Sequence, residues 1–400
     1  MQVLVLNSGS SSLKFQLFLM PEAKILCSGI IERIGFEDAK FKFKTEKNTI
    51  EIVTPIPNHK VGLELVSKQL LDTETGIIKS TDDIDIVGHR VVHGGKYFSN
   101  TTEITETVKE KIKALSSLAP LHNPPNLEGI EVAETIFPNA KQVAVFDTAF
   151  HQSIPEYAYK YAIPNKYSEE DSIRLYGFHG TSHKYVSEKA IEYLGKDHSK
   201  IITIHLGNGC SMTAVKDGKS IDHSLGFSPV NGLIMGTRSG DIDQSIIFHL
   251  AKKYNYTLEE INTMLQKKSG MIGLTGFSDL RDILSEAEKG NKDCKLALEM
   301  SAYRIKKYIG SYAAILNGLD AIVFTAGIGE NSPPMRKLVC TDLDYLGIAI
   351  DDDKNQIRSD ALNDISAETA KVKVLVIPTN EELEIAKQSV SLFKNESSFI

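Results

Sequence analysis

Three glycine-containing segments of this 400-residue chain carry residue types that bind phosphate. They are Asn7-Ser8-Gly9-Ser10-Ser11-Ser12, His205-Leu206-Gly207-Asn208-Gly209 and Gly327-Ile328-Gly329-Glu330-Asn331. Each follows a short apolar run that predicts a strand, so its turn exposes backbone N–H groups, and the first segment adds hydroxyl groups and the nearby Lys14 ammonium. A serine- and glycine-rich segment alone is usually a plain loop, and none of the three completes a P-loop or a G-x-G-x-x-G fingerprint. Three of them at strand ends together favour a phosphate site.

Two arginines and one histidine lie close to glycines, where a side chain can approach a ligand. Arg90 comes just past a predicted strand, Arg238 lies in a turn, and His179 lies at the predicted start of a helix. We expect the arginines to point at an anion, which is either a ligand or a structural carboxylate. His179 would donate to an anion at the helix N-terminus or cap the helix, and no H-E-x-x-H pattern supports a metal site with His183.

Acidic side chains follow two further predicted strands. Asp147 comes directly after the strand of residues 142–146, and Glu381 and Glu382 follow the strand of residues 372–377. Carboxylates near phosphate loops are candidate ligands of Mg²⁺, directly or through water. The alternative is that each one only stabilises the start of a helix.

The elements that would position these residues form two similar halves. Residues 3–6 predict a buried strand, and after the serine and glycine turn residues 13–19 alternate with period two, as in the second strand of a hairpin. Residues 201–204 and 211–215 repeat this pattern at an offset of about 199 residues. We therefore expect a duplicated α/β domain, with two unrelated α/β domains as the alternative.

The rest of the chain mixes strands and helices. Further strands are predicted at residues 25–31, 41–43, 50–53, 84–87, 142–146, 321–324 and 372–377. Helices are predicted at residues 61–71, 108–118, 127–137 with Asn126 as its cap, 241–254, 258–265 with a capping box of Thr257 and Glu260, and 295–316.

The composition excludes several classes of protein. With 42% hydrophobic and 24% charged residues the chain is of the ordinary globular kind, and its net charge of −7 argues against nucleic-acid binding. Cys27, Cys210, Cys294 and Cys340 lie far apart, which argues against a zinc site or a disulfide framework and favours the cytoplasm. No run of 18 apolar residues occurs and the N-terminal run is too short for a signal peptide, so we expect neither a membrane span nor export.

Taken in chain order, these motifs resemble the acetate kinase (acetokinase) family from end to end. The resemblance implies the fold of the acetate and sugar kinase, Hsp70 and actin superfamily: α/β, with duplicated actin-like ATPase (ribonuclease H-like) domains and an interdomain cleft. It implies an N-terminal domain of residues 1–147, on which a C-terminal helix of residues 384–400 packs, and a nucleotide-binding domain of residues 148–383. The motifs that carry it are residues 5–14, 89–95, 119–124, 146–151, 177–183, 205–209, 236–241 and 327–331.

The resemblance also implies a role for each motif residue. Asn7 and Glu381 would hold Mg²⁺, for which Mn²⁺ can substitute, and the catalytic residues would be Asp147, His179, Arg238 and Arg90. Arg90 would also meet the carboxylate of the substrate. The methyl group would be received by Val92, Leu121, Phe178 and Pro229. ATP or ADP would be bound by Lys14, His205, Leu206, Gly207, Asn208, Gly209, Asp279, Leu280, Arg281, Gly327, Ile328, Gly329, Glu330 and Asn331.

The expected reaction is direct in-line transfer of a phosphoryl group from ATP to acetate, which yields acetyl phosphate and ADP. A carboxylate is already ionised at neutral pH and needs no general base, so the difficulty is charge repulsion, which arginines, His179, Lys14 and a metal would overcome. A propionate or other short-chain carboxylate kinase, a sugar kinase with Asp147 as base, and a non-enzymatic Hsp70-like or actin-like ATP-binding module are the alternatives. The resemblance further implies a homodimer.

Four residues depart from the pattern of the family. Asn231, Gln244, Ala326 and Leu175 stand where the family usually has Glu, Pro, Gly and Arg. Ala326 lies closest to the expected nucleotide site, so it bears on the conformation of the turn that follows it.

Overall fold

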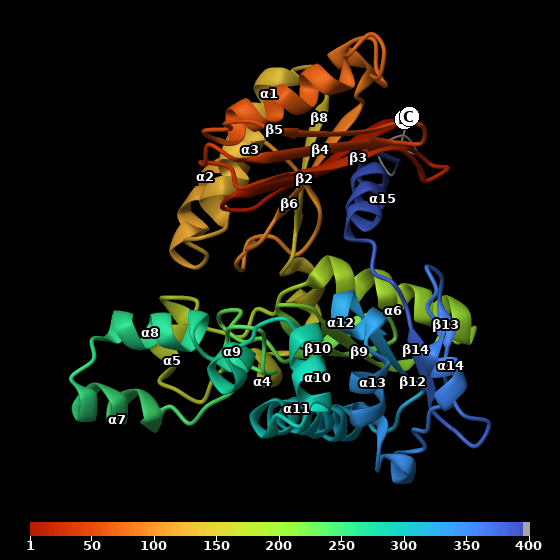
Figure 1. Ribbon diagram of the computed structural model, residues 1–400. Helices are drawn as coiled ribbons and strands as arrows, with labels where there is room; N and C mark the ends of the chain where they lie inside the picture. The colour runs from red at the N-terminus through yellow and green to blue at the C-terminus, as the bar shows by residue number, and fades with distance from the viewer. Residues whose placement is uncertain (395–400) are drawn as a thin grey trace. The chain divides into compact units, whose positions relative to one another are not determined.

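The computed structural model describes residues 1–394, and the chain divides into two compact units (Figure 1). Unit 1 comprises Met1–Phe150 and the segment from Asn380, and unit 2 comprises His151–Thr379. The boundaries expected from the sequence fall after residues 147 and 383, three and four residues away. The end of the expected C-terminal helix, residues 395–400, lies outside the described residues.

The sheet of unit 1 has eight strands in the order β5-β4-β3-β2-β1-β6-β8-β7. Strand β1 pairs antiparallel with β2 and parallel with β6, which in turn pairs parallel with β8. The carboxyl ends of β1, β6 and β8 therefore meet at one edge. The strands are β1 (Gln2–Ser8), β2 (Ser12–Leu19), β3 (Lys24–Glu32), β4 (Lys40–Thr45), β5 (Thr49–Val53), β6 (Ile86–Val91), β7 (Thr102–Glu103) and β8 (Lys141–Phe146).

Helices cover both faces of this sheet (Figure 1). Leu4 and Leu6 of β1 share a core with α1 and α3, whereas Val3 and Val5 share a core with α15. Burial on both faces explains why residues 3–6 form a continuous apolar run, while the period of two keeps each residue on its own face. The helices of unit 1 are α1 (His59–Leu70), α2 (Glu106–Ala114), α3 (Asn123–Ile136) and α15 (Glu381–Lys394).

The sheet of unit 2 has six strands in the order β11-β10-β9-β12-β14-β13. Three antiparallel neighbours, β11, β10 and β9, continue into β12 and β14, which run parallel to β9. Strands β3, β2, β1, β6 and β8 have the same order and the same directions in unit 1, so the internal repeat is confirmed as a duplicated topology. The strands are β9 (Lys200–Leu206), β10 (Cys210–Lys216), β11 (Lys219–His223), β12 (Ala321–Thr325), β13 (Asn363–Asp364) and β14 (Lys373–Val376).

Helices α6 and α11 pack on this second sheet. Helix α6 contacts β9 and β12, and the long α11 contacts β9 and β10. Within the described part of the chain, no helix is both long and apolar enough to span a membrane. The helices of unit 2 are α4 (Glu156–Tyr159), α5 (Asn165–Glu169), α6 (Gly180–Leu194), α7 (Ser245–Tyr254), α8 (Leu258–Lys267), α9 (Gly270–Thr275), α10 (Leu280–Glu288), α11 (Lys292–Leu316), α12 (Ala326–Asn331), α13 (Pro333–Cys340) and α14 (Asp352–Gln356).

Helix α3 begins at Asn123, so the expected cap at Asn126 is wrong. Prolines in its first turn have no N–H to satisfy and favour the start of a helix at this point. The side chain of Asn126 instead accepts a hydrogen bond from the Val92 N–H (3.0 Å) and donates one to the Ser8 carbonyl (2.6 Å). It thereby joins the segment after β1 to the segment after β6.

Candidate functional site

Arg90 and Asp147 form a bidentate ion pair in unit 1. Arg90 lies inside β6 and not past it, because β6 continues in parallel register with β8 as far as Val91. Its Nε donates to Oδ1 of Asp147 at 3.0 Å and its Nη2 donates to Oδ2. Asp147, directly after β8, is only 1% exposed, so the two oxygens depend on this guanidinium.

The same guanidinium gathers the two residues expected to hold a metal. Nη1 of Arg90 donates to Oδ1 of Asn7 at 3.1 Å, and Nε lies 4.0 Å from Oε2 of Glu381. Burial acts to lower the pKa of Arg90, but the charges of Asp147 and Glu381 outweigh it and the pKa is raised. The ends of β1, β6 and β8 and the start of α15 thus bring Asn7, Arg90, Asp147 and Glu381 together around one permanent positive charge.

The carboxyl group of Glu381 has a raised pKa because it is buried and lies near other carboxylates. Burial raises its pKa to about 7; Arg90 acts against this, while Asp147 and Glu382 add to it. Glu382 itself pairs with Lys14 at 3.4 Å. Residues 1–394 hold no cluster of three or more His, Cys, Asp or Glu side chains arranged to bind an ion by themselves. The amide and carboxylate oxygens fit Mg²⁺, which binds through one or two protein ligands and otherwise through water and phosphate oxygens.

The residues expected to receive a methyl group divide between the units. Val92 is buried and Leu121 is 58% exposed in unit 1, whereas Phe178 is buried in unit 2. Pro229, also in unit 2, accepts a hydrogen bond at its carbonyl from Nη1 of Arg238 at 2.8 Å. Each unit therefore supplies two of the four residues.

His179 and Arg238 converge on Gly209 in unit 2. A methyl group at Gly209 would lie 3.6 Å from Nε2 of His179 and 3.8 Å from Nη1 of Arg238. His179 precedes α6 with a φ of +58°, and its side chain does not cap the helix; Nδ1 instead shares a hydrogen bond of 2.8 Å with Oγ of Ser211. Burial lowers the pKa of Arg238. Two donors and the backbone of a glycine turn therefore occupy one place, as an anion site requires.

His179 and four other histidines of unit 2 form a cluster. Neighbouring ring centroids lie between 4.1 Å (His151 and His223) and 6.0 Å (His183 and His205) apart. Burial lowers the pKa of His151 to about 4 and those of His183 and His223 well below the usual value. Their hydroxyl partners are Ser220 for His151, Ser211 for His179 and His183, Thr203 for His183, Ser182 for His205 and Thr213 for His223.

The hydroxyl partners were not found from the sequence, although a signal exists. Thr203 and His205 on β9 lie opposite Thr213 and Ser211 on β10. These polar residues recur at period two within strands that are otherwise apolar. Polar residues on one buried face of a hairpin must satisfy each other, so this pattern indicates an internal hydrogen-bond network.

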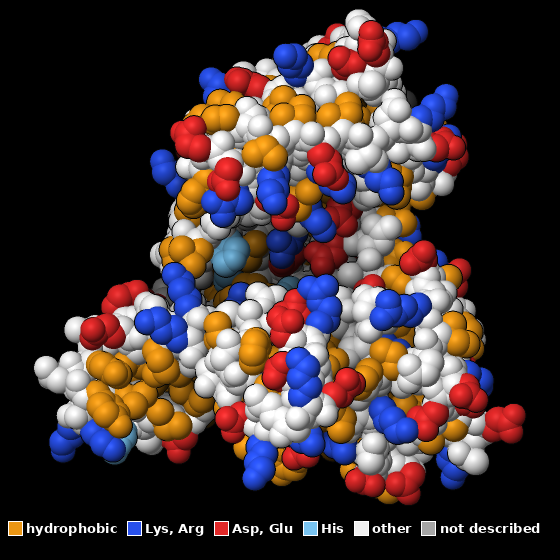
Figure 2. Space-filling view, viewed as in Figure 1, with side chains coloured by type: hydrophobic (Ala, Val, Ile, Leu, Met, Phe, Trp, Pro, Cys, Tyr) orange, Lys and Arg blue, Asp and Glu red, His pale blue; other side chains and the backbone are white. Residues whose placement is uncertain are grey.

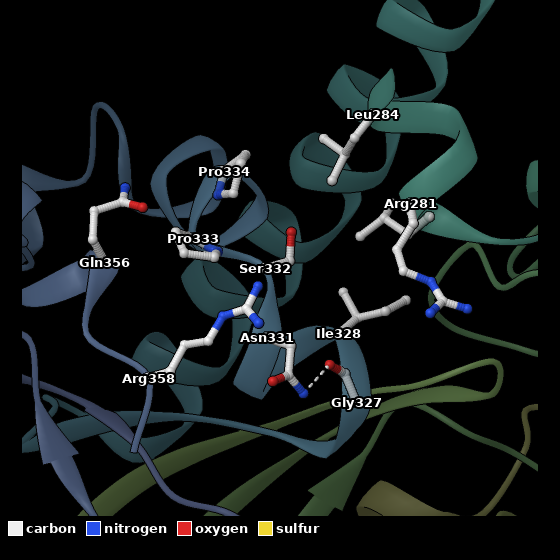
Figure 3. Close-up of a pocket in the computed structure, with 11 residues that line it drawn as sticks. Arg281, Leu284, Gly327, Ile328, Asn331, Ser332, Pro333, Pro334, Gln356 and Arg358 are labelled. Carbon is white, nitrogen blue, oxygen red and sulfur yellow. Dashed lines mark hydrogen bonds between the residues drawn. The ribbon is translucent and has the colours of Figure 1, made fainter. Parts of the chain in front are cut away.

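A cavity of about 760 Å³ in unit 2 is lined by residues of two of the expected nucleotide-binding segments, 279–281 and 327–331 (Figure 3). Of the residues expected there, it brings together Leu280, Arg281, Gly327, Ile328 and Asn331. A smaller hollow that shares Leu280 and Ile328 also touches Gly207. The further lining residues, which the sequence did not indicate, are Leu284, Ser332, Pro333, Pro334, Gln356 and Arg358.

The other expected nucleotide residues support these segments. Asp279 forms an ion pair with Arg281 (2.6 Å), and the Asn208 carbonyl accepts a hydrogen bond from the Gly236 N–H. Glu330 accepts the Thr379 N–H at 3.0 Å. Buried Arg336 donates to the carbonyls of Gly329 and Glu330. Leu206 is buried in β9.

The segment Gly327–Asn331 is helical and not a turn, since it belongs to α12. Nδ2 of Asn331 donates to the Gly327 carbonyl at 3.0 Å (Figure 3). The reversal of the chain falls on Ala326, which is buried with a φ of +64°. This left-handed conformation strains an L-residue and is free for glycine. Ala326, where the family usually has Gly, therefore keeps the left-handed backbone of the turn but strains it.

Comparison with known proteins places these features in one family. The acetokinase family model matches residues 2–387. A curated acetate kinase from Flavobacterium johnsoniae is 67% identical over 395 residues, which cover 99% of this chain and 100% of the relative. That of Methanosarcina thermophila is 52% identical over 402 residues, covering 99% and 98%.

Solved structures agree over nearly the whole chain. The crystal structure of Porphyromonas gingivalis acetate kinase is 44% identical with a TM-score of 0.93 and covers 98% of this chain and 99% of that one. A propionate kinase from Francisella tularensis is also 44% identical, with a TM-score of 0.92 and the same coverage.

Replacing Gly209 by alanine should impair turnover without unfolding the protein. The methyl group would make ordinary contacts but would occupy the place beside the His179 and Arg238 donors, so the turnover number should fall at least about tenfold. The thermal unfolding midpoint should hardly change. Gly310→Ala, where an added methyl group meets nothing within 4 Å, is the matched control and should keep full turnover. Wild-type turnover of Gly209→Ala would contradict the assigned donor site.

The buried histidines should make unit 2 sensitive to acid. In the unfolded chain a histidine is protonated below about pH 6.5, whereas His151 in the folded chain stays neutral down to about pH 4. As the pH is lowered through this range, the free energy of unfolding therefore falls by about 1.4 kcal/mol per pH unit for each such histidine. Asp222, whose pKa burial raises to about 6, opposes this, but three histidines outnumber it. The free energy of unfolding should be measured by urea unfolding between pH 6.5 and 5. Its slope against pH should be smaller in His151→Gln than in the wild type, by the amount that corresponds to about one proton.

The exposed His198 provides the control for this measurement, since its side chain is 93% exposed. His198→Gln should leave the pH dependence as in the wild type. A free energy of unfolding that stays constant from pH 6.5 to 5 would rule out the neutral, buried histidine cluster.

Proposed function

The chain belongs to the acetokinase family and is a phosphotransferase that acts on a carboxyl group; we propose that it catalyses the reversible transfer of the γ-phosphoryl group of ATP to acetate. The observation that carries the proposal is the 67% identity to a curated acetate kinase over nearly the full length of both chains. The products are acetyl phosphate and ADP. We further propose that it acts in the cytoplasm, which suits four free, buried cysteines.

In this proposal, Arg90 binds the carboxylate of acetate. A guanidinium has five N–H donors, and the bonds to Asp147 and Asn7 use three of them. Two donors are left by these bonds, which is the number that a carboxylate accepts from an arginine in a bidentate pair. Asp147 is a positioning residue here, because it holds the guanidinium while the substrate binds.

Asn7 and Glu381 would hold Mg²⁺, or Mn²⁺ in its place. When bound, the ion would neutralise negative charge on the phosphate groups of the nucleotide. The raised pKa of Glu381 supports this role, because a buried carboxylate beside Asp147 and Glu382 is stabilised by an added cation. Lys14, which pairs with Glu382, would add positive charge near the phosphate groups.

The nucleotide would bind to unit 2, in the cavity beside α10 and α12. His179 and Arg238 would then stabilise the phosphoryl group during transfer, since its loose transition state spreads negative charge over three oxygens. No general base is needed, because acetate is already ionised. Catalysis consists of bringing two anions together against their repulsion and of holding them in line.

The competing functions fit these contacts less well. A sugar kinase needs Asp147 as a base, but both of its oxygens already accept hydrogen bonds from Arg90, so the carboxylate is engaged in holding that guanidinium. Propionate is the closer rival, since solved acetate and propionate kinases are equally similar to this chain. Buried Val92 would leave little room for a longer acyl chain, which favours acetate. One methylene group is worth roughly 1–3 kcal/mol, so the preference will be graded.

We also propose that two copies of the chain associate through α7. None of the ten residues of α7 is buried, although Ile246 and Phe248 are apolar and Phe248 is 70% exposed. Tyr254, Tyr256 and Leu258 extend the exposed apolar surface to α8, and Figure 2 shows hydrophobic side chains gathered there. An amphipathic helix whose apolar side chains stay exposed in its own chain is stabilised by a partner from another, and a second copy offers an identical apolar helix.

Trapping the product with hydroxylamine tests the proposed reaction. The wild type should form acetyl hydroxamate from acetate and ATP, and kcat/KM should fall from acetate to propionate to butyrate. Arg238→Ala should lower kcat by about 10³-fold or more, the effect of removing an arginine from a transferred phosphoryl group. Arg33→Ala, at a surface ion pair with Asp38, is the control and should be fully active. Absence of hydroxamate with every short-chain acid would end the proposal.

Sedimentation of Phe248→Glu tests the association of two copies. A charge on the apolar face of α7 should convert the assembly to a 44.2 kDa monomer, because a carboxylate cannot be buried unpaired at the contact. Tyr345→Glu changes an equally exposed aromatic residue of another segment and should leave the assembly intact. A wild-type chain that sediments as a monomer would refute the proposal.

A further inference from the structure

A chain of three hydrogen bonds runs from the interior of unit 2 to His179. Nδ1 of His179 lies 2.8 Å from Oγ of Ser211, the same Oγ lies 2.7 Å from Nε2 of His183, and Nδ1 of His183 lies 2.7 Å from Oγ1 of Thr203. The two histidines lie one turn apart at the start of α6, Thr203 is on β9 and Ser211 is on β10. Thr203, Ser211 and His183 are fully buried.

The direction of the chain follows from counting protons. Ser211 has a single hydroxyl proton and lies between two ring nitrogens, so it donates to one and accepts from the other. His183 is neutral, because burial lowers its pKa well below the usual value, and it donates from one nitrogen only. All three hydrogen bonds therefore point the same way, either toward His179 or toward Thr203.

Thr203 decides between these two directions. Among the described residues, His183 is the one hydrogen-bond partner of its hydroxyl group. If the bonds pointed toward Thr203, its own proton would be buried without an acceptor, which is rarer and more costly than an unused lone pair. In the other direction Thr203 donates to Nδ1 of His183, Nε2 of His183 donates to Ser211, and Ser211 donates to Nδ1 of His179.

We propose that Thr203, His183 and Ser211 form a positioning relay that holds the ring of His179 with its proton on Nε2. Nε2 is the nitrogen beside Gly209 and Arg238. The relay rests on the proposed function in one respect, namely that Nε2 donates to the transferred phosphoryl group. Ser211 also fixes the orientation of the ring, which stacks on His205 at 4.4 Å.

The ¹⁵N shifts of the imidazole nitrogens test the placement of the proton in the absence of any substrate. In the wild type at neutral pH, the signals lost in His179→Gln should show a protonated Nε2 and an unprotonated Nδ1. The opposite tautomer would overturn the proposal. Because this measurement needs no catalysis, it stands apart from the hydroxamate assay, whose failure would refute the proposed function and leave the tautomer to be decided.

A double-mutant cycle tests whether Ser211 acts through His179. Ser211→Ala should lower kcat about 10–100-fold, part of the loss expected for a missing transition-state donor, with KM for ATP and acetate within about threefold of wild type. Ser211→Thr, which keeps the hydroxyl, should recover most of kcat. In the His179→Gln background, Ser211→Ala should cause no further loss beyond about twofold. Multiplicative losses would show a merely structural role for Ser211 and would overturn the relay.

Discussion

The ion pair of Arg90 and Asp147 is the constraint on which the site of unit 1 depends. Asp147 is almost fully buried at the end of β8, and a carboxylate in such a place must be paired and hydrogen-bonded. Because burying both charges costs about as much as their attraction returns, the pair adds little to stability. The pair instead fixes the orientation of the Arg90 guanidinium, so that Asn7 and Glu381 contact it in a defined position. The parallel register of β6 and β8 makes this possible, since it ends the two strands side by side.

The topology was predictable because it rests on hydrophobic periodicity. Residues 3–6 and 201–204 are buried strands in equivalent places, and the strand order repeats between the units. The predicted start of helix α3 was wrong, because tertiary contacts determine how Asn126 is used. The side chain of Asn126 was expected to cap a helix, but it is used between Ser8 and Val92, and such a contact cannot be inferred from neighbours in the sequence.

The site was predictable by residue type and less so by partner. Glycines, arginines and acids at strand ends predicted Arg90, Asp147, Arg238 and Gly209 as site residues, and the structure groups Arg90 with Asp147 and Arg238 with Gly209. Ser211 escaped notice because a serine in an apolar strand carries no distinctive signal by itself. Its meaning appears only when the register sets it opposite His205. Arg358 was missed for another reason: it reaches the cavity from the segment after α14, which shares no motif with α12.

The left-handed alanine at the start of α12 has a consequence for the entropy of ligand binding in the adjoining cavity. Alanine samples fewer backbone conformations than glycine, so residue 326 has less freedom to lose when a ligand binds in the adjoining cavity. The strain is built into the fold of the chain and need not be generated on binding. A stiffer wall of this kind favours fast, preorganised capture of a ligand.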